Sequence, residues 1–287
     1  ACVIPSVHIS RENVETIKEY TRKIAEEMHV QGLMNMQYAI ENGKVFVLEA
    51  NPRASRTVPL VSKVCNVRMV PIATEIITRE LTGKESPVPA LEEKVIPYYG
   101  VKEAAFPFNM FPEVDPLLGP EMRSTGEVLG LSESYGEAFY KAQEAVQSKL
   151  PLSGTVLISV NRKDKAEVVE VAKLFHENNF RIIATEGTCQ LINEAGIPAE
   201  KVKKLCEGRP NVLDEITNGK VDIIVNSPVG KDSVYDDSYL RKAAIKGRIP
   251  YCTTMAAAMA AATGIHAVNN HDGGKIASLQ ELHGRIK

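Results

Sequence analysis

The chain has 287 residues, a net charge of -2, and 44% hydrophobic and 24% charged residues. That length is enough for about two domains, and the composition is typical of a globular protein. The nearly balanced charge excludes a strongly basic surface of the kind that binds nucleic acid or a membrane, and no apolar run predicts a membrane span. Five scattered cysteines without a Cys-x-x-Cys pair indicate reduced thiols and a cytoplasmic protein.

The first expected elements are a short strand, a helix and a hairpin. Residues 1–5 read as the middle of a strand, and because no Met precedes them we take the chain for part of a longer protein. Ser10 predicts the start of a helix, whose apolar residues recur at helical spacing. Apolar strands follow over 33–40 and 45–51, and Asn42-Gly43 between them predicts a two-residue hairpin turn. Four apolar residues open the second strand and indicate that it is buried.

The second strand of this hairpin ends in an unusual polar cluster. Glu49 and Asn51 share one face of the strand, because side chains alternate with period two. The hairpin would place Gln37 opposite Glu49. Oxygen ligands on one face suit Mg²⁺ or Mn²⁺, and Arg53 and Arg56 just beyond could bind phosphoryl oxygens. The pattern predicts a metal–nucleotide site for phosphoryl transfer, although a Glu-x-Asn-Pro segment could also simply end a strand.

Further elements complete the first half of the chain. A helix pair is expected over 58–83 and a polar, proline-bearing connection over 84–100. Residues 101–130 hold four prolines and several aromatic residues, which predicts an ordered irregular loop packed over a site. An amphipathic helix is expected over 133–149, and the composition shifts at 151–154.

The second half alternates strands and helices, which predicts a parallel α/β domain. The expected strands are 155–160, 181–184, 222–226 and 249–252, and the expected helices are 164–178, 188–196, 211–218, 235–247 and 254–262. Ligands bind in loops at the carboxyl ends of such strands, where Thr185 and Asn226 lie. A helix opening at Gly187-Thr188 could bind an anion, although Thr188 could equally be a helix cap.

Three long strings resemble the C-terminal end of the large subunit of carbamoyl phosphate synthetase. They are GLMNMQ at 32–37, LEANPRASRTVP at 48–59 and DPLLGPEMRSTGEV at 115–128, and the resemblance covers essentially the whole chain. It implies that residues 1–147 are the last part of the ATP-grasp domain that phosphorylates carbamate, built from an antiparallel sheet and helices. Residues 148–287 would be a methylglyoxal-synthase-like allosteric domain with a parallel sheet.

The resemblance assigns roles to the polar cluster. Gln37, Glu49 and Asn51 match metal ligands around the phosphates of the substrate ATP. Arg53 and Arg56 match catalytic arginines at the phosphate end of the same site. Carbamate oxygen would attack the γ-phosphorus while the metal and the arginines stabilise the developing charge, which gives carbamoyl phosphate and ADP.

Two effector sites are also implied by the resemblance. The residues that match the binding site for a nucleotide effector such as UMP or IMP are Lys165, Thr185, Thr188, Lys204 and Asn226. After Asn226 the chain has Ser227-Pro228 where a well-known bacterial pattern has two threonines, so the identity of the nucleotide stays open.

The second of these sites takes an ornithine-type effector. Glu103, Tyr251 and Thr253 match part of it, and its other acidic residues would precede the first residue of the chain.

The resemblance also implies two protein partners, the amidotransferase small subunit and the preceding part of the large subunit. No glycine-rich phosphate loop is visible over residues 1–60, so we expect the isolated chain to be catalytically inert or nearly so. An alternative is a stand-alone nucleotide-sensing module. A methylglyoxal-synthase-type lyase would need a carboxylate base, and the segment that should supply it, 207–211, has no Asp. Another ATP-grasp ligase, such as biotin carboxylase, would leave the 115–128 string and the α/β tail unexplained.

Overall fold

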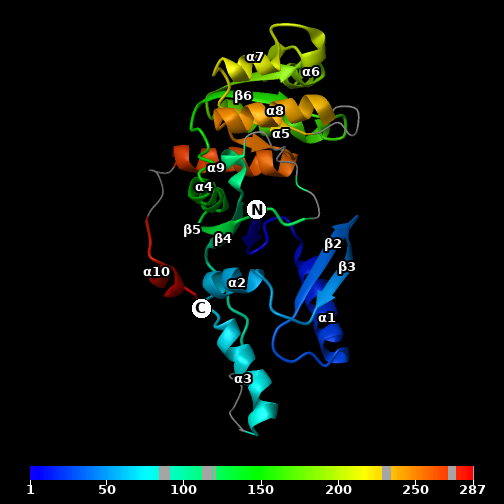
Figure 1. Cartoon of the computed structure of the whole chain (residues 1–287), viewed down its shortest axis with the longest axis vertical. Helices are drawn as coiled ribbons and strands as arrows, with labels where there is room; N and C mark the ends of the chain where they lie inside the picture. The colour runs from blue at the N-terminus through cyan, green and yellow to red at the C-terminus, as the bar shows by residue number, and fades with distance from the viewer. Residues whose placement is uncertain (84–90, 112–117, 119–120, 228–233, 271–275, 287) are drawn as a thin grey trace. The chain divides into compact units, whose positions relative to one another are not determined.

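The computed structural model describes residues 1–83, 91–111, 118, 121–227, 234–270 and 276–286 (Figure 1). It forms two compact units. The first comprises Ala1–Cys2 with Gly100–Ile276, and the second comprises Val3–Tyr99 with Ala277–Lys287. In the described ranges, no helix is both long and apolar enough to span a membrane. These units are defined by contacts within the chain, and the boundary at 147/148 stays a prediction.

The second unit begins with a helix and a hairpin, followed by three more helices. Its described elements are α1 (Arg11–Glu27), β2 (Asn35–Glu41), β3 (Lys44–Asn51), α2 (Thr57–Cys65), α3 (Met69–Thr82) and α10 (Leu279–His283). Ser10 is the N-cap of α1, because its side chain accepts a hydrogen bond from the Asn13 backbone N–H. The expected helix start is therefore confirmed, as is the helix pair, whose members end at Asn66 and Gly83 in the left-handed conformation.

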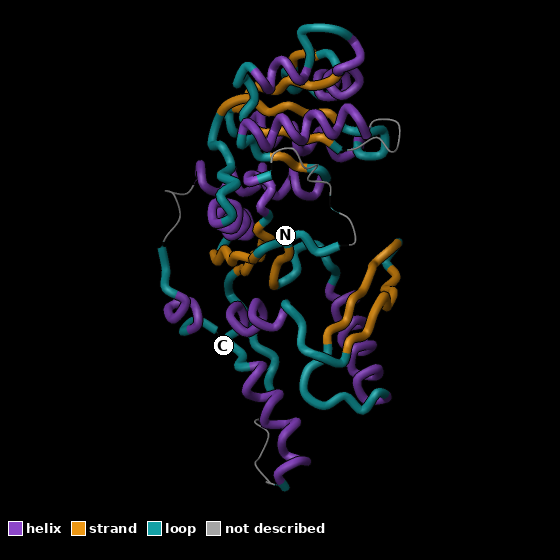
Figure 2. Tube along the Cα trace, in the orientation of Figure 1, coloured by secondary structure: helices purple, strands orange, loops and turns teal. Residues whose placement is uncertain are grey.

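The hairpin of β2 and β3 has the expected register and turn. Gln37 pairs with Glu49 in the antiparallel ladder. Asn42 and Gly43 have φ of 50° and 76°, the pair of positive values that a type I′ turn requires. Helix α1 contacts β3 on one side of the hairpin, as Figure 2 shows, and the hydroxyls of Thr21 and Tyr38 lie 2.7 Å apart there.

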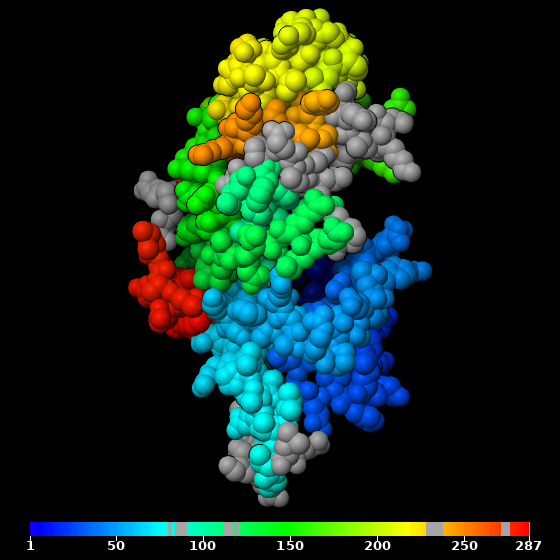
Figure 3. Space-filling model, in the orientation of Figure 1, coloured from blue at the N-terminus to red at the C-terminus, as the bar shows by residue number. Residues whose placement is uncertain are grey.

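The expectation that the second strand is buried was wrong. Phe46, Val47 and Leu48 are 46%, 43% and 64% exposed. A two-stranded sheet has two faces, and among the described residues α1 accounts for the contact on one of them. The hairpin (blue) therefore forms part of the molecular surface that Figure 3 shows.

The first unit contains a small sheet and a helix beside it. Its elements here are β4 (Tyr99–Ala105), η1 (Pro107–Met110), β5 (Gly126–Ser132) and α4 (Tyr135–Ala145), and the strand order is β1-β4-β5 with β1 at Cys2–Ile4. The irregular loop predicted within 101–130, over 107–127, begins with η1, and its last two residues belong to β5 instead. Its proline-rich centre, 112–117 with 119–120, lies outside the described residues.

A parallel sheet forms the rest of this unit, as expected, with five strands where four were predicted. Its strands are β6 (Gly154–Ser159), β7 (Phe180–Thr185), β8 (Glu200–Val202), β9 (Ile223–Asn226) and β10 (Tyr251–Cys252), in the order β10-β9-β6-β7-β8. The helices are α5 (Lys165–Glu177), α6 (Glu186–Glu194), α7 (Val212–Thr217), α8 (Val234–Gly247) and α9 (Met255–Asn270), with the short helix η2 at Leu205–Glu207. Every neighbouring pair of strands is parallel. The mixed α/β fold class is thus confirmed.

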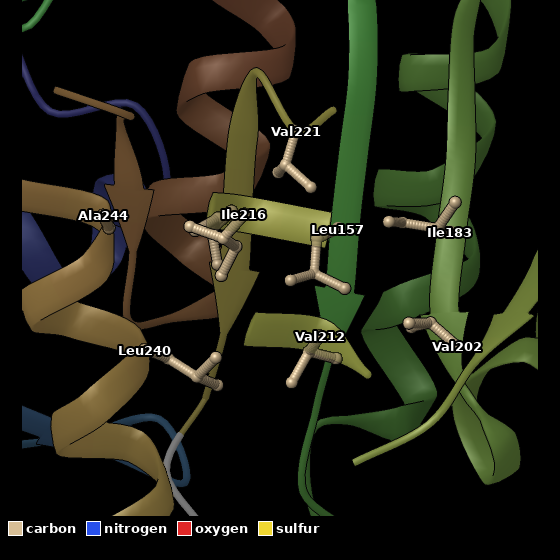
Figure 4. Packing of buried hydrophobic residues seen from close by; sticks show 9 residues of the cluster. Leu157, Ile183, Val202, Val212, Ile216, Val221, Leu240 and Ala244 are labelled. Carbon is tan, nitrogen blue, oxygen red and sulfur yellow. The ribbon is translucent and has the colours of Figure 1, made fainter. Parts of the chain in front are cut away.

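Apolar side chains pack on both faces of this sheet. On one face, Leu157 and Ile183 meet Ile216 of α7 and Leu240 of α8 in a single cluster (Figure 4). Side chains alternate along a strand, so Val156 and Ile158 point to the other face. All of these are at most 5% exposed. The sheet is therefore buried on both faces.

Helices α4 and α9 cross at a very short distance. A Cβ added to Gly136 would lie 2.6 Å from the Thr263 carbonyl oxygen, and one added to Gly264 would lie 3.0 Å from the Gly136 carbonyl oxygen. Helix α9 continues to Asn270, eight residues beyond its expected end at 262. Gly264 therefore allows close packing of α9 against α4, although Thr263-Gly264 in the sequence is typical of the end of a helix.

Candidate functional sites

Four amide or carboxylate side chains share one face of the hairpin. Gln37 is opposite Glu49, and Asn35 is opposite Asn51, so period-two alternation puts all four on the same face. Tyr38, the next residue after Gln37, points to the α1 side. The structure thus brings the three predicted metal ligands together. Sequence reasoning missed Asn35, which the same two-residue spacing from Gln37 would have revealed.

These side chains offer oxygen donors to a ligand. Gln37 and Glu49 are exposed and Asn51 is half-buried. A β-bulge follows Gln37 and leaves Leu48 as the extra residue between Val47 and Glu49. Bulges of this kind re-aim side chains next to sites. One carboxylate with neutral amide oxygens is a donor set that Mg²⁺ or Mn²⁺ accepts, with water and phosphate completing the shell. By donor type, these residues are compatible with the divalent metal that the sequence predicts.

The two predicted phosphate arginines follow directly after β3. The Arg53 backbone N–H donates to the Asn51 carbonyl at 2.8 Å, which forms a tight turn, and the Arg53 Nη1 donates to the Ala54 carbonyl at 3.0 Å. Arg56 is the N-cap residue of α2. Both guanidinium groups belong to exposed residues. The turn and the helix start thus hold two cationic forks within five residues of the ligand face.

The predicted effector residues lie at the carboxyl edge of the parallel sheet. Ser159 ends β6 and pairs with Asn226, which ends β9. Thr185 ends β7, and its Oγ1 donates to the Ser159 Oγ at 3.3 Å. On the other side, the Asn226 Nδ2 donates to the Tyr251 hydroxyl of β10 at 2.6 Å. Three adjacent strands, β7, β6 and β9, therefore end in polar residues, and Tyr251 at the start of β10 bonds to the last of them. Thr185 and Asn226 are each only 4% exposed.

The lysines of this predicted site lie near the start of α6. Lys165 opens α5, and its Nζ donates to the Gly187 carbonyl at 3.1 Å. Thr188, in the first turn of α6, is 2% exposed. Lys204 follows β8, is exposed, and is close enough to Glu186 to help lower the pKa of that carboxyl, after the larger effect of Lys201. Cations and helix N–H groups suit an anion such as a phosphate monoester.

A further polar residue of this edge, Asn161, was not predicted, and it contacts Ser227, which follows Asn226. The Ser227 Oγ accepts from the Asn161 backbone N–H at 3.0 Å and lies 3.2 Å from the Asn161 Nδ2. Ser227 is 2% exposed. It thus ties the loop after β6 to the end of β9. Pro228, on which the departure from the bacterial pattern rests, lies outside the described residues.

The three residues predicted for an ornithine-type effector line one cavity of the first unit. The cavity has a volume of about 780 Å³ and includes Glu103, Tyr251 and Thr253 in its wall. The Glu103 carboxylate accepts from the Gln143 Nε2 at 2.8 Å, which fixes its orientation. An acidic group beside hydroxyls could bind a small cationic amine. Tyr251 lines this cavity and also accepts the hydrogen bond from the Asn226 Nδ2. This bond joins the two predicted effector sites.

Cys252 also lines this cavity, but its thiol is not a good nucleophile. Burial, reinforced by the Glu103 carboxylate, raises the pKa of its thiol to about 12. The thiol therefore stays protonated at neutral pH, and only a thiolate is a good nucleophile. Cys252 is a packing residue, as expected.

Comparisons with known proteins match both parts of the chain. Residues 2–81 match the model of the carbamoyl-phosphate synthase L chain ATP binding domain, and residues 167–253 match that of the MGS-like domain. A carbamoyl phosphate synthase large chain from Methanosarcina barkeri is 41% identical over 287 residues, 99% of this chain and 70% of that protein. The chain belongs to the carbamoyl phosphate synthase large-chain family.

Other members of the family are longer. The large chain of Archaeoglobus fulgidus is 47% identical over 99% of this chain, and the match covers 26% of that protein. The C-terminal section of the large chain of Methanocaldococcus jannaschii is 45% identical over the whole of this chain and 48% of its own length. The chain thus spans about a quarter of several carbamoyl phosphate synthase large chains that it matches.

Proposed function

We propose that this chain is the C-terminal part of a carbamoyl phosphate synthase large chain that phosphorylates carbamate with ATP. Residues 1–147 contribute one side of the ATP site, and residues 148–287 form the allosteric domain. The observation that carries the proposal is the register of the hairpin, which puts Gln37, Glu49 and Asn51 on one exposed face directly before Arg53 and Arg56.

In this proposal each residue of the hairpin has a distinct task. Gln37, Glu49 and Asn51 would hold Mg²⁺ or Mn²⁺, which neutralises phosphate charge when bound. Arg53 and Arg56 would bind the oxygens of the transferring phosphoryl group and stabilise the charge that develops on it. Carbamate is itself the nucleophile, so the site needs no covalent intermediate on a side chain.

The partners follow from the same reading. A cytoplasmic enzyme of this type would take its ammonia from an amidotransferase small subunit that hydrolyses glutamine. The preceding part of the large chain would supply the glycine-rich loop and the adenine pocket that clamp ATP against the hairpin. The exposed apolar residues of β3 are consistent with a surface that is covered in such an assembly.

We therefore expect the isolated 287-residue chain to make no carbamoyl phosphate. The assay is ADP release and carbamoyl phosphate formation from ATP and carbamate, with and without the preceding part of the large chain. Activity should require both parts, and Arg56→Ala should abolish it in the reconstituted enzyme. Synthesis by the isolated chain alone would contradict the expectation that half of the ATP site is missing.

The second proposal concerns the allosteric domain, which could bind its effectors in the isolated chain. The polar residues at the strand ends, Thr185, Ser159 and Asn226, favour effector binding. A lyase of the methylglyoxal synthase type is disfavoured, because 207–211 contains no Asp and the nearest Asp in sequence is Asp214. Its carboxylate is bound by the Arg209 guanidinium and accepts from the Asn211 N–H at 2.9 Å. Arg209, ahead of the Asn211 N–H, lowers the pKa of Asp214, which makes it a weak base.

Calorimetric titration with UMP, IMP and ornithine, with inorganic phosphate as a control, tests this second function. We expect saturable binding of a nucleotide, weakened at least about tenfold by Lys165→Ala or Lys204→Ala, since each removes a charge-assisted hydrogen bond. Lys173→Ala is the matched control, because Lys173 is an exposed lysine of the same helix as Lys165. Equal binding in all variants would exclude these lysines from the site, and no nucleotide binding at all would refute an independent sensor.

A further inference from the structure

The C-terminal end of α2 receives side chains from distant parts of the second unit. An α-helix leaves its last carbonyl groups without partners inside the helix. The Tyr98 hydroxyl donates to the Val64 carbonyl at 2.6 Å, and the Lys94 Nζ donates to the Asn66 carbonyl at 2.8 Å. Tyr98 is 1% exposed. Side chains outside α2, a helix of nine residues, therefore hold its C-terminal end in place.

A third bond comes from the C-terminal segment of the chain. The His283 Nε2 lies 2.6 Å from the Lys63 carbonyl oxygen, across 220 positions of sequence. A carbonyl can only accept, so Nε2 carries the proton and donates. Leu282, the residue before it, is 5% exposed, and Figure 1 shows α10 beside α2. A donor at a helix C-terminus also interacts favourably with the helix dipole.

The other end of α2 lies at the candidate phosphate site. Arg56 is its N-cap, and Val58, Leu60 and Val64 are its buried residues. A helix of this length is about 13 Å long and behaves as a short rigid rod. Fixing its C-terminal end therefore restricts the direction of its first turn and of the Arg56 side chain.

We propose that residues 277–286 are a positioning strap for the phosphate arginine. His283 is the positioning residue: it binds the end of α2 through the Lys63 carbonyl and so holds Arg56 at the other end of the helix. The inference rests on the proposed metal–phosphate site. The last residues of the proposed allosteric domain in sequence thus act on the unit that carries the hairpin.

Hydrogen–deuterium exchange of the 287-residue chain measures the strap directly. His283→Ala should speed exchange of the amides over 58–66 on the order of fivefold, since a single hydrogen bond is lost. His283→Gln places an N–H donor at a similar distance and should restore slow exchange. His176→Ala is the matched control, because His176 also lies in the last turn of a helix but belongs to the first unit.

A binding measurement separates positioning from general loosening. The probes are Mn²⁺ alone and Mn²⁺ with pyrophosphate, followed by electron paramagnetic resonance. His283→Ala should weaken pyrophosphate binding about threefold or more and leave the affinity for Mn²⁺ alone unchanged, because the metal ligands lie on the hairpin. His283→Gln should recover the pyrophosphate affinity.

The outcomes are distinct. Unchanged exchange over 58–66 in His283→Ala would overturn the strap, and so would a failure of His283→Gln to restore it. Loosening of α2 by Leu282→Ala alone would overturn the role of His283 and assign the contact to apolar packing. If the unchanged chain binds neither Mn²⁺ nor pyrophosphate, the proposed metal–phosphate site fails, while the exchange data still decide whether the strap exists.

Discussion

Replacing Glu49 with glutamine should remove most divalent-metal binding from this chain. In the proposed metal site, Glu49 would supply the carboxylate of a ligand set whose other members, Gln37 and Asn51, are neutral amides. Changes to residues that merely support metal ligands reduce affinity about 10- to 100-fold, so loss of this direct ligand should reduce it at least as much. The change keeps the size of the side chain, which leaves the cross-strand pair with Gln37 in place. Electron paramagnetic resonance of Mn²⁺ measures the affinity.

Glu41→Gln is the control for this variant. Glu41 lies on the same strand as Gln37 but four residues away, roughly 14 Å along the strand, and pairs with Lys44 beside the turn. Its replacement should leave Mn²⁺ binding unchanged. In the complete large chain, Glu49→Gln should lower kcat for carbamate phosphorylation about a hundredfold or more, because metal ions contribute several kcal/mol to such transition states. Wild-type Mn²⁺ affinity in Glu49→Gln would contradict the assignment of the hairpin face.

Replacing Gly130 with alanine should have the largest effect on stability. A Cβ at this position of β5 would lie 2.1 Å from the Ala138 carbonyl oxygen and 2.7 Å from the Ala142 nitrogen, both backbone atoms of α4. Backbone cannot rotate away as a flexible side chain can, so β5 and α4 must separate. Overpacking in cores costs about 1–3 kcal/mol and occasionally more, and we expect about 3 kcal/mol or a failure to fold. Urea unfolding followed by circular dichroism measures it.

Gly126→Ala is the matched control in the same strand. Its added Cβ would meet only the Ala105 Cβ, at 3.9 Å, which is ordinary contact. Its free energy of unfolding should therefore stay within about 0.5 kcal/mol of the unchanged chain. Equal stability of the two variants would mean that β5 and α4 are less tightly packed than the structure shows.

The elements that were predicted correctly are those whose sequence signals lie within a few neighbouring residues. The hairpin needs only Asn42-Gly43 and the apolar runs beside it, and the register then pairs Gln37 with Glu49. Strand β8 was missed, because its three residues include Glu200 and Lys201 and lie at the sheet edge. Helix α10 was missed although Ser278 forms a capping box at its start, a spacing that is readable in sequence.

What remained out of reach depends on contacts between distant segments. The exposure of β3 could not be read from its apolar residues, since periodicity describes a strand but not what covers it. The bond between His283 and Lys63 spans 220 positions, and the sequence around neither residue predicts it.

The crossing of α4 and α9 bears on how the allosteric domain can transmit a signal. Gly136 and Gly264 bring the two backbones so close that neither helix can slide without a steric clash. The connection between α4 and β6 is fastened as well, since the Leu150 carbonyl accepts from the Tyr140 hydroxyl at 3.4 Å and the Leu152 carbonyl from the Asn269 Nδ2 at 3.0 Å. The contacts on both sides of 147/148 lie within one compact unit, so we expect α4 and the parallel sheet to move as one body.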